Sequence, residues 1–390
     1  MNLRVLLLII GSLLLPLGCD GPPGPSELCS DLPDTAIATF QDANLEAAIR
    51  AALSVGAQED LTCGLISGLT ELHATSRGIT SLVGIQNLTS LTDLDIRDNS
   101  ISDIGPLSGL TGLTTLYLND NSIADIGPLS GLTGLTNLLW LSNNSISDIG
   151  ALSGLTSLTY LRLDHNSISD ISALGGLTSL TNLDLYHNSI SDISALSGLT
   201  SLIGLYLDHN SISDISALSG LTGLRTLHLN NNSITDISAL SGLTSLTNLS
   251  LSDNSITDIG PLSGLTGLTH LWLRDNSISD IGPLSGLTSL TYLILDNNSI
   301  SDISALSGLT SLTYLYLDNN SISNVSALSG LTTLVYLNLD SNPNITDIQP
   351  LLDNTGLGAG DRVLLRVTSV SCTDVAALQA KGVTVQSDCP

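Results

Sequence analysis

One phrase of the sequence returns at a fixed interval over most of the chain. It reads Leu-x-x-Leu-x-Leu-x-x-Asn-x-Ile, and its asparagine recurs at the spacing that separates Asn99 from Asn121. One step, from Asn121 to Asn144, is a single residue longer because an extra leucine, Leu138 or Leu139, has entered, and an earlier copy has Arg77 in the asparagine position. A fixed period of this length predicts a solenoid, in which each repeat forms one coil and neighbouring coils bury each other's apolar side chains. The asparagines are Asn99, Asn121, Asn144, Asn166, Asn188, Asn210, Asn232, Asn254, Asn276, Asn298, Asn320 and Asn342.

Within one coil, inward and outward positions alternate. In Leu116-Tyr117-Leu118 the two leucines fall on one side of an extended segment and Tyr117 falls on the other. The pattern therefore predicts one short strand in each coil, and stacking of the coils predicts a parallel sheet with strands about 4.8 Å apart. The phrase resembles the leucine-rich repeat over roughly three quarters of the chain. This resemblance implies a horseshoe with a concave parallel β-sheet and a convex side of 3-10 helices and loops.

Two polar columns accompany the leucines. The asparagine lies where the strand ends and the chain turns inward, and we expect its amide to pair buried backbone groups in coil after coil. In the second column we expect each side chain to cap a single helical turn. A ladder of calcium sites is the alternative, but the sequence lacks the Gly-Gly-x-Gly-x-Asp repeat of such ladders. The second column consists of Asp103, Asp125, Asp148, Asp170, Asp192, Asp214, Asp236, Asp258, Asp280, Asp302, Asn324 and Asp347.

Segments that depart from the repeat flank it on both sides. Residues 35–66 contain an amphipathic helix between Asp42 and Leu53, which resembles the helical N-terminal cap of internalin-like repeat proteins. Residues 349–390 contain one last strand and a helix that begins at Cys372, and they resemble the C-terminal cap of bacterial repeat lipoproteins. The predicted fold is an α/β solenoid: a leucine-rich-repeat horseshoe over residues 67–348 with a helical N-terminal cap and a disulfide-closed C-terminal cap.

The first residues predict export. Residues 1–18 combine a basic start with an apolar run of the length of a secretory signal peptide. The run ends in Leu-Gly-Cys, which resembles the bacterial lipoprotein box and would make Cys19 a lipidated first residue; the alternative is ordinary cleavage. Residues 19–34 are rich in Gly and Pro and predict an extended, lipid-anchored tether. The chain is therefore expected to be a membrane-anchored lipoprotein of the bacterial cell envelope or surface.

Four cysteines remain after Cys19. Three pairings are possible in principle. About 12 coils, each about 4.8 Å thick, hold the two ends of the solenoid some 55 Å apart, so bridges between the ends are excluded. We therefore expect the local pairs Cys29–Cys63 and Cys372–Cys389, one in each cap.

Composition excludes some classes of function. The net charge is −26 with only ten Lys and Arg residues, which argues against nucleic-acid binding. The sequence also lacks a Gly-rich phosphate loop, a His-Glu-x-x-His motif and a nucleophile elbow. We therefore expect neither an enzyme nor a cofactor.

The outward strand positions vary from coil to coil, whereas the convex segments hardly change. Every Tyr and Trp of the chain falls in these positions, and aromatic and Arg side chains dominate the energetics of protein interfaces. Exposed strands also favour aromatic residues for purely structural reasons, which is the simpler interpretation. The predicted ligand-binding residues are Tyr117, Trp140, Tyr160, Arg162, Tyr186, Tyr206, His228, Trp272, Arg274, Tyr292 and Tyr316.

Three histidines precede the asparagine in consecutive coils: His165, His187 and His209. They should stack about 4.8 Å apart, and adjacent imidazoles could share zinc or copper. The simpler interpretation is that they are turn residues copied by duplication. We expect no metal ion, and these three are the candidate ligands if one binds.

The sequence thus predicts a non-enzymatic extracytoplasmic binding protein, similar to internalins, that recognises a protein or glycan through its concave face. The alternative is a structural or self-associating protein of the cell envelope, in which the near-identical coils provide stiffness and length.

Overall fold

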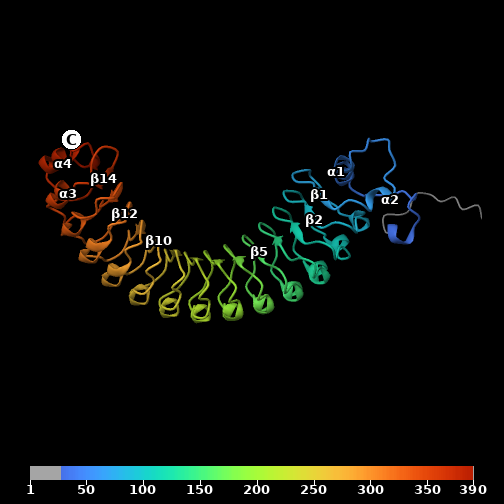
Figure 1. Ribbon diagram of the computed structural model, residues 1–390, viewed down its shortest axis with the longest axis horizontal. Helices are drawn as coiled ribbons and strands as arrows, with labels where there is room; N and C mark the ends of the chain where they lie inside the picture. Colours follow the sequence, from blue (N-terminus) through green and yellow to red (C-terminus); the bar gives the residue numbers. More distant parts are fainter. Residues whose placement is uncertain (1–27, 390) are drawn as a thin grey trace, which may run out of the picture.

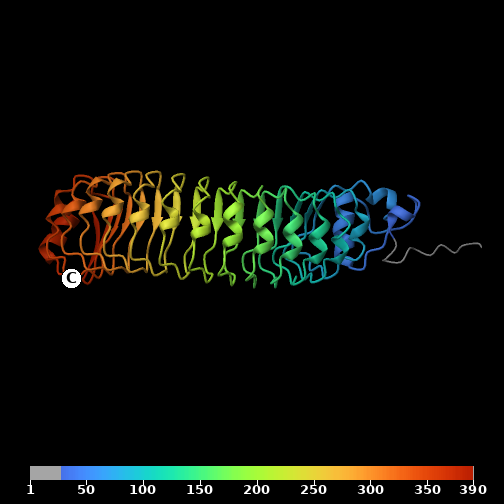
Figure 2. The ribbon, with the colours of Figure 1, turned by 90° about the horizontal axis from the view of Figure 1, so that it is seen from below.

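The computed structural model describes residues 28–389. They form one curved solenoid, with strands along the inner side of the arc and short helices along the outer side (Figure 1). The signal peptide, Cys19 and most of the tether lie outside the described residues. Seen from the convex side, the coils follow one another in a single row (Figure 2). The predicted horseshoe is confirmed.

Within residues 28–389, one parallel sheet of 15 strands, paired in sequence order, lines the concave side. Each strand residue pairs with its equivalent one coil away, as Leu116 does with Leu94. The longer coil keeps this register, because Leu139 takes the inward position and Leu138 the outward one. The strands are β1 (Glu71–His73), β2 (Asp93–Asp95), β3 (Thr115–Tyr117), β4 (Leu138–Trp140), β5 (Tyr160–Arg162), β6 (Asn182–Asp184), β7 (Gly204–Tyr206), β8 (Thr226–His228), β9 (Asn248–Ser250), β10 (His270–Trp272), β11 (Tyr292–Ile294), β12 (Tyr314–Tyr316), β13 (Tyr336–Asn338), β14 (Arg362–Leu365) and β15 (Thr384–Ser387).

The core is an aliphatic stack between the sheet and the convex segments. Leu116 and Leu118, which the sequence places on the inward side, are fully buried, and so are their equivalents in the other repeats. One coil alone would leave these side chains in water, so each coil depends on its neighbours for burial. Because the inward residues of each strand are buried in this stack, the alternate residues of the strand are the ones that face the concave surface.

The asparagine column forms the predicted ladder. In one coil, Asn121 Nδ2 donates to the carbonyls of Leu118 and Ile96, and Asn121 Oδ1 accepts from the Ile101 backbone N–H at 3.0 Å. The same pattern repeats from Asn99 to Asn342. Each amide thus links its own coil to the preceding one and satisfies backbone groups that would otherwise be unpaired.

Short 3-10 helices cover the convex side, and the aspartate column lies just before them. Asp103 Oδ1 accepts from the Gly105 N–H at 2.8 Å. The residue that caps this helix is Ile104, and it makes no side-chain capping bond. Asp103 was predicted to be the cap, but it lies one residue before the N-cap position and closes an Asx turn instead, which still pairs the first free N–H of the helix. The 3-10 helices of the repeats are η2 (Ile85–Asn87), η3 (Gly105–Leu107), η4 (Gly127–Gly131), η5 (Gly150–Gly154), η6 (Ser172–Gly176), η7 (Ser194–Gly198), η8 (Ser216–Leu218), η9 (Ser238–Leu240), η10 (Gly260–Leu262), η11 (Gly282–Gly286), η12 (Ser304–Gly308) and η13 (Ser326–Leu328).

The N-terminal cap consists of α1 (Ala43–Leu53), α2 (Cys63–Ile66) and a 3-10 turn, η1 (Cys29–Asp31). Asp42 caps α1 as predicted, since its Oδ1 accepts from the N–H groups of Asn44 and Leu45. The predicted disulfide Cys29–Cys63 is present. The folded cap therefore includes residues that the sequence analysis assigned to the tether.

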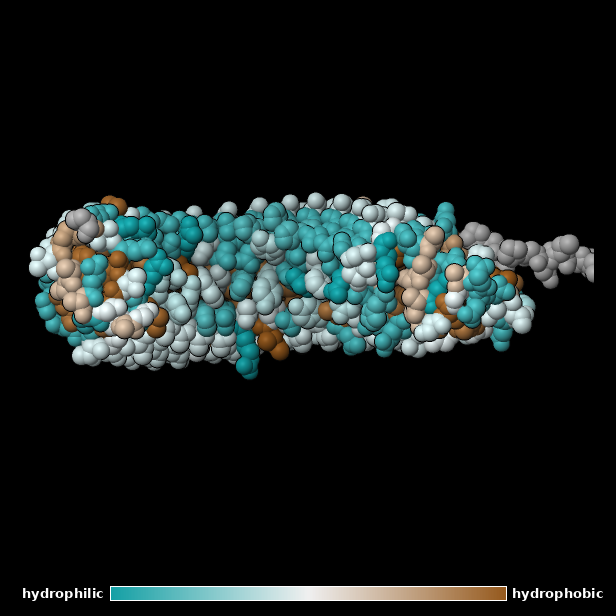
Figure 3. Space-filling model, turned by 90° about the horizontal axis from the view of Figure 1, so that it is seen from above, coloured by the Kyte–Doolittle hydropathy of each residue, from teal (hydrophilic) through white to brown (hydrophobic). Residues whose placement is uncertain are grey.

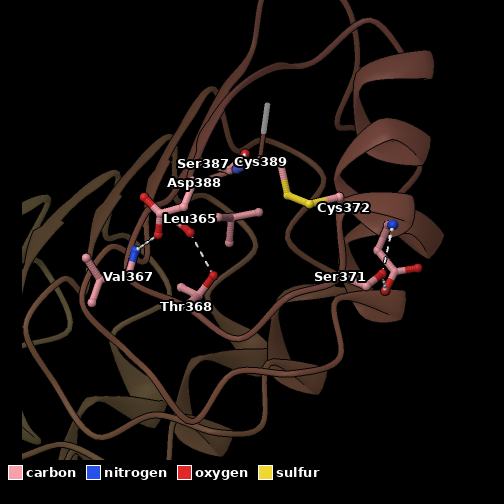
Figure 4. Close-up of a disulfide and its surroundings, with 9 residues drawn as sticks. Leu365, Val367, Thr368, Ser371, Cys372, Ser387, Asp388 and Cys389 are labelled. Atoms are coloured by element: carbon pink, nitrogen blue, oxygen red, sulfur yellow. Dashed lines mark hydrogen bonds between the residues drawn. A yellow bond between two sulfur atoms is a disulfide. The ribbon is translucent and has the colours of Figure 1, made fainter.

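The C-terminal cap consists of α3 (Gln349–Asp353), β14, α4 (Cys372–Ala380) and β15. Lys381 Nζ donates to the carbonyls of Leu352 and Asn354 at 2.8 and 2.6 Å, which joins the end of α4 to α3. The disulfide Cys372–Cys389 closes the cap as predicted (Figure 4). The end of the aliphatic stack is thereby covered.

Candidate recognition surface

Three columns of side chains cover the concave face of the sheet. The first and third residues of each strand form the first and second columns, and the residue two positions after the strand forms the third, because alternate residues of an extended segment face the same side. All of the predicted ligand-binding residues lie in these columns. Tyr160 and Tyr292 belong to the first; Tyr117, Trp140, Arg162, Tyr206, His228, Trp272 and Tyr316 to the second; and Tyr186 and Arg274 to the third.

These side chains lie on the surface rather than in the core. All are partly buried except Arg274, whose side chain is 55% exposed. Seen from the concave side, the molecule is mostly hydrophilic or neutral in hydropathy, and strongly hydrophobic residues show mainly as separate spots (Figure 3). Each predicted ligand-binding side chain is therefore partly covered by the protein and partly open to solvent.

The N-terminal part of the surface combines aromatic rings with guanidinium groups. The rings of Tyr117 and Trp140 lie 6.0 Å apart between centroids. The Arg162 guanidinium carbon lies 4.4 Å from the Trp140 ring centroid, and that of Arg97 lies 5.4 Å from the Tyr117 ring. Both distances are within the range of cation–π attraction.

The C-terminal part carries a nearly continuous run of rings from β7 to β13. Successive centroids are 4.8 to 6.2 Å apart. Aromatic pairs at such separations attract each other and restrict each other's rotamers, so the rings are pre-positioned for a partner. The run consists of Tyr206, His228, Trp272, Tyr292, Tyr316 and Tyr336.

A hollow of about 490 Å³ interrupts this surface at the coil of β9. Ser250 stands in the second column between His228 and Trp272, and its short side chain leaves space that the larger neighbours border. Ser252 lies in the third column of the same coil, and Tyr186 also lines the hollow. The sequence analysis named the aromatic walls and missed the serines, whose only signal is their small size within a variable column.

Buried and partly buried carboxylates lie close to Arg162 and His228 on this face. Arg162 Nη2 lies 3.1 Å from Asp184 Oδ2, and Arg162 Nε lies 3.4 Å from Asp164 Oδ1. Burial, followed by repulsion from Asp164, raises the pKa of Asp184 to about 6. Burial raises the pKa of Asp208, and burial lowers the pKa of His228, whose Nδ1 lies 3.7 Å from that carboxylate. This surface therefore carries acidic groups that are poorly hydrated and responsive to a neighbouring charge.

The three stacked histidines lie beside the third column. The His165 and His187 rings are 4.9 Å apart between centroids, and the His187 and His209 rings are 5.6 Å apart. All three have a positive φ near 55°, the left-handed conformation in which Asn, Asp and His are enriched. Within residues 28–389, no group of three His, Cys, Asp or Glu side chains has an arrangement that could hold a metal ion. The backbone conformation explains the choice of residue type at these positions.

The repeat architecture matches known proteins. A family model described as "Leucine Rich repeats (2 copies)" matches overlapping segments from residue 111 to 308 and residues 310–353, and a second leucine-rich-repeat model matches residues 87–105. An internalin (inlF) from Listeria monocytogenes is 39% identical over 81% of this chain and 94% of its own, with a TM-score of 0.79. The chain belongs to the internalin-like leucine-rich-repeat proteins.

More distant structures share the fold of this internalin-like chain. The functional domain of InlJ from Listeria monocytogenes is 25% identical, covers 84% of this chain and 81% of its own, and has a TM-score of 0.63. The plant peptide hormone receptor RGFR1, in complex with RGF2, is 21% identical over 79% of this chain and 61% of its own, with a TM-score of 0.65. None of the curated proteins matches the chain.

Two disulfides are typical of a protein that functions outside the reducing cytosol, as expected for an internalin-like protein. In the described part of the chain, every helix is too short or too polar to cross a bilayer.

Proposed function

We propose that this internalin-like protein is a non-enzymatic extracytoplasmic binding protein whose concave face recognises a protein partner. One observation supports this most directly: the shared register of the coils brings Tyr, Trp and Arg residues, far apart in sequence, onto one contiguous face. These are the residue types that carry most of the binding energy in protein interfaces.

The details of the surface favour a protein over a uniform polymer. The hollow at β9 suits a side chain that protrudes from a partner, because aromatic walls offer contact area and polar lining residues such as Asn231, Asp253 and Arg274 offer hydrogen bonds. The N-terminal and C-terminal parts differ in chemistry: guanidinium groups lie over Tyr117 and Trp140 in the first, and a longer run of rings from β7 to β13 forms the second. The plant peptide hormone receptor RGFR1, which shares the fold, is known in complex with RGF2.

The protein would be held at a membrane through a lipid on Cys19, with the following Gly- and Pro-rich residues as a spacer. Expression of the full chain with an alkyne-labelled fatty acid tests this part. The label should enter the wild-type protein and not the Cys19→Ser variant. Equal labelling, or none in either protein, would leave the anchor without support.

The concave face is tested by a triple variant, Tyr206→Ser, Trp272→Ser and Tyr316→Ser. The matched control replaces Thr200, Thr266 and Thr310 with Ala, each six positions earlier in the same coil and exposed. A partner captured by the wild-type protein from surface extracts is identified and its affinity is measured for all three proteins. The serine variant should bind at least about a hundredfold more weakly, which corresponds to about 2.8 kcal/mol.

The control variant should bind as the wild type does, and both variants should melt at a similar temperature. Equal affinity of the serine variant and the control would contradict recognition through the concave face. Capture of a second copy of this chain, unaffected by the serine substitutions, would instead favour the self-associating envelope protein.

A further inference from the structure

Five charged side chains occupy the third column in five consecutive coils. In order they are Arg274, Asp296, Asp318, Asp340 and Arg366, so two positive charges flank three negative ones. The strand β14 is one residue longer than β13, and Arg366 belongs to this column because Leu364 pairs with Asn338. Neighbouring members are held about one strand spacing apart, near 4.8 Å. The row therefore has one more carboxylate than it has guanidinium groups.

The two outer carboxylates each have a guanidinium partner. Arg274 Nε lies 3.2 Å from Asp296 Oδ2, and Arg366 Nη2 lies 2.5 Å from Asp340 Oδ2. In both pairs, the arginine reaches across to the adjacent coil. The same geometry, a guanidinium over a third-column carboxylate one coil away, thus occurs twice in this part of the molecule.

The middle carboxylate has only neutral partners. Asn338 Nδ2 donates to Asp318 Oδ1 at 2.8 Å, and Asn319 Nδ2 donates to Asp318 Oδ2 at 3.2 Å. Among residues 28–389, no Lys, Arg or His forms an ion pair with Asp318. Burial raises the pKa of the Asp318 carboxyl, and the like charge of Asp340 acts in the same direction; backbone and Asn319 hydrogen bonds and the more distant Arg274 guanidinium oppose this rise only in part. A cation brought to Asp318 would be attracted by a carboxylate that is poorly compensated.

Three tyrosine rings lie on the same face of the sheet, in the same coil as this carboxylate and in the next one. Tyr316 precedes Asp318 by two residues and lies 4.8 Å from Tyr336 between ring centroids, while Tyr314 lies 6.5 Å from Tyr336. Tyr314 is 40% exposed, so its ring is open to a ligand. A planar guanidinium can stack on such rings while its N–H groups face a carboxylate.

The protein shows this mode of stacking both at this surface, where Arg362 already contacts one of the rings, and at β5. The guanidinium carbon of Arg362 lies 5.9 Å from the Tyr336 ring centroid, and that of Arg162 lies 4.4 Å from the Trp140 ring while its nitrogens approach Asp184 and Asp164. Ring and carboxylate together thus engage an arginine of the chain itself at β5.

We propose that the surface formed by Tyr314, Tyr316, Asp318 and Tyr336 binds the guanidinium group of an arginine side chain on the partner protein. This inference rests on recognition through the concave face and names the chemistry that one part of that face recognises. The arginine completes the row of charges, because it supplies the third guanidinium for the third carboxylate.

The probe is a fluorescein-labelled Gly-Arg-Gly-Arg-Gly peptide, and its counterpart has citrulline, which is neutral and nearly the same shape, in place of each arginine. Fluorescence anisotropy at physiological salt measures both peptides against the full chain, because screening then suppresses non-specific attraction to its net charge of −26. The arginine peptide should bind at least about tenfold more tightly, equivalent to about 1.4 kcal/mol.

Two charge-matched variants locate the site. Asp318→Asn should weaken the arginine peptide about tenfold. Asp236→Asn removes the same charge from the convex side, where Asp236 accepts only from the Ser238 N–H, and should leave binding unchanged. Both variants should melt at or above the wild-type temperature.

Equal losses in both variants, or equal binding of the two peptides, would overturn the inference and assign the attraction to overall charge. The triple Ser variant of Tyr206, Trp272 and Tyr316 and its triple Ala control on the exposed threonines distinguish this outcome from failure of the proposed function. If a partner still depends on Tyr206, Trp272 and Tyr316 while the peptides fail the test, the concave face remains the recognition surface and only its arginine site is wrong.

Discussion

Replacing Asn320 with Ala tests how much one rung of the asparagine ladder contributes to stability. The side chain is 8% exposed and makes four hydrogen bonds to backbone groups. Its Oδ1 is the acceptor for the Ile300 N–H at 2.9 Å, while the carbonyls of Leu295 and Leu317 also accept from the asparagines of neighbouring coils. The substitution therefore leaves one donor without an acceptor and three acceptors with fewer bonds.

The expected loss follows from these groups. A buried donor without a partner costs about 1–3 kcal/mol, and loss of the remaining bonds adds about 1 kcal/mol, so the free energy of unfolding should fall by about 2–4 kcal/mol. Urea unfolding followed by circular dichroism measures it. The control is Asn182→Ala on the concave face, where the amide oxygen accepts only from the Thr181 hydroxyl. Its loss should be about 0.5 kcal/mol or less, as for an ordinary surface substitution.

Similar losses below about 1 kcal/mol in both variants would refute the reasoning. They would mean that water or a shift of the turn replaces the amide at little cost, and that the leucine stack alone determines the stability of the coils.

Three further changes have defined outcomes. Because the folded pKa of Asp184 is raised to about 6 from 3.8, the folded chain holds a proton that the unfolded chain has released, and stability falls as pH rises through that window. Urea unfolding should therefore show that the free energy of unfolding of Asp184→Asn rises relative to the wild type between these pH values and that the difference stays constant at higher pH. A difference that does not change with pH would contradict this. Asp42→Ala removes the cap of α1 together with bonds to Thr80, and should cost about 2 kcal/mol by the same assay, more than Asp103→Ala, which loses one exposed bond. Replacing Cys372 and Cys389 with Ala should cost about 3 kcal/mol, because the bridge closes a loop with a sequence separation of 17, and amide exchange should speed up in the C-terminal cap before it does in the central coils.

Much of the fold is predictable because the repeat leaves few alternatives. Alternation in Leu116-Tyr117-Leu118 determines which side is buried, and repetition then determines the register of every strand. The asparagine ladder follows from the need to pair backbone groups. Both disulfides follow from the separation of the two ends. These features depend on local pattern and period alone.

Other features depend on contacts that the pattern does not specify. Whether Asp103 caps the 3-10 helix or closes the preceding turn is a matter of one residue, and sequence alone does not distinguish the two. The packing of Cys29 against the cap, so close to the Gly- and Pro-rich segment, likewise depends on tertiary contacts.

The candidate surface was predictable in its residues and not in its interactions. The aromatic rings stand out in a variable column, whereas the lack of an ion pair at Asp318 is evident only once the guanidinium partners of Asp296 and Asp340 are known. Likewise, the hollow at Ser250 is a property of what the adjacent coils carry.

The common register of the coils allows the length of such a solenoid to change by whole repeats. Any internal coil presents the same two flanks to its neighbours, so an in-frame gain or loss of one whole repeat would be accommodated without new packing. A repeat gained or lost between Trp140 and Tyr316 would change the distance between these two side chains by about 4.8 Å. Recombination between near-identical repeats can thus change the distance between two binding residues of the concave face without changing the side chains around either of them.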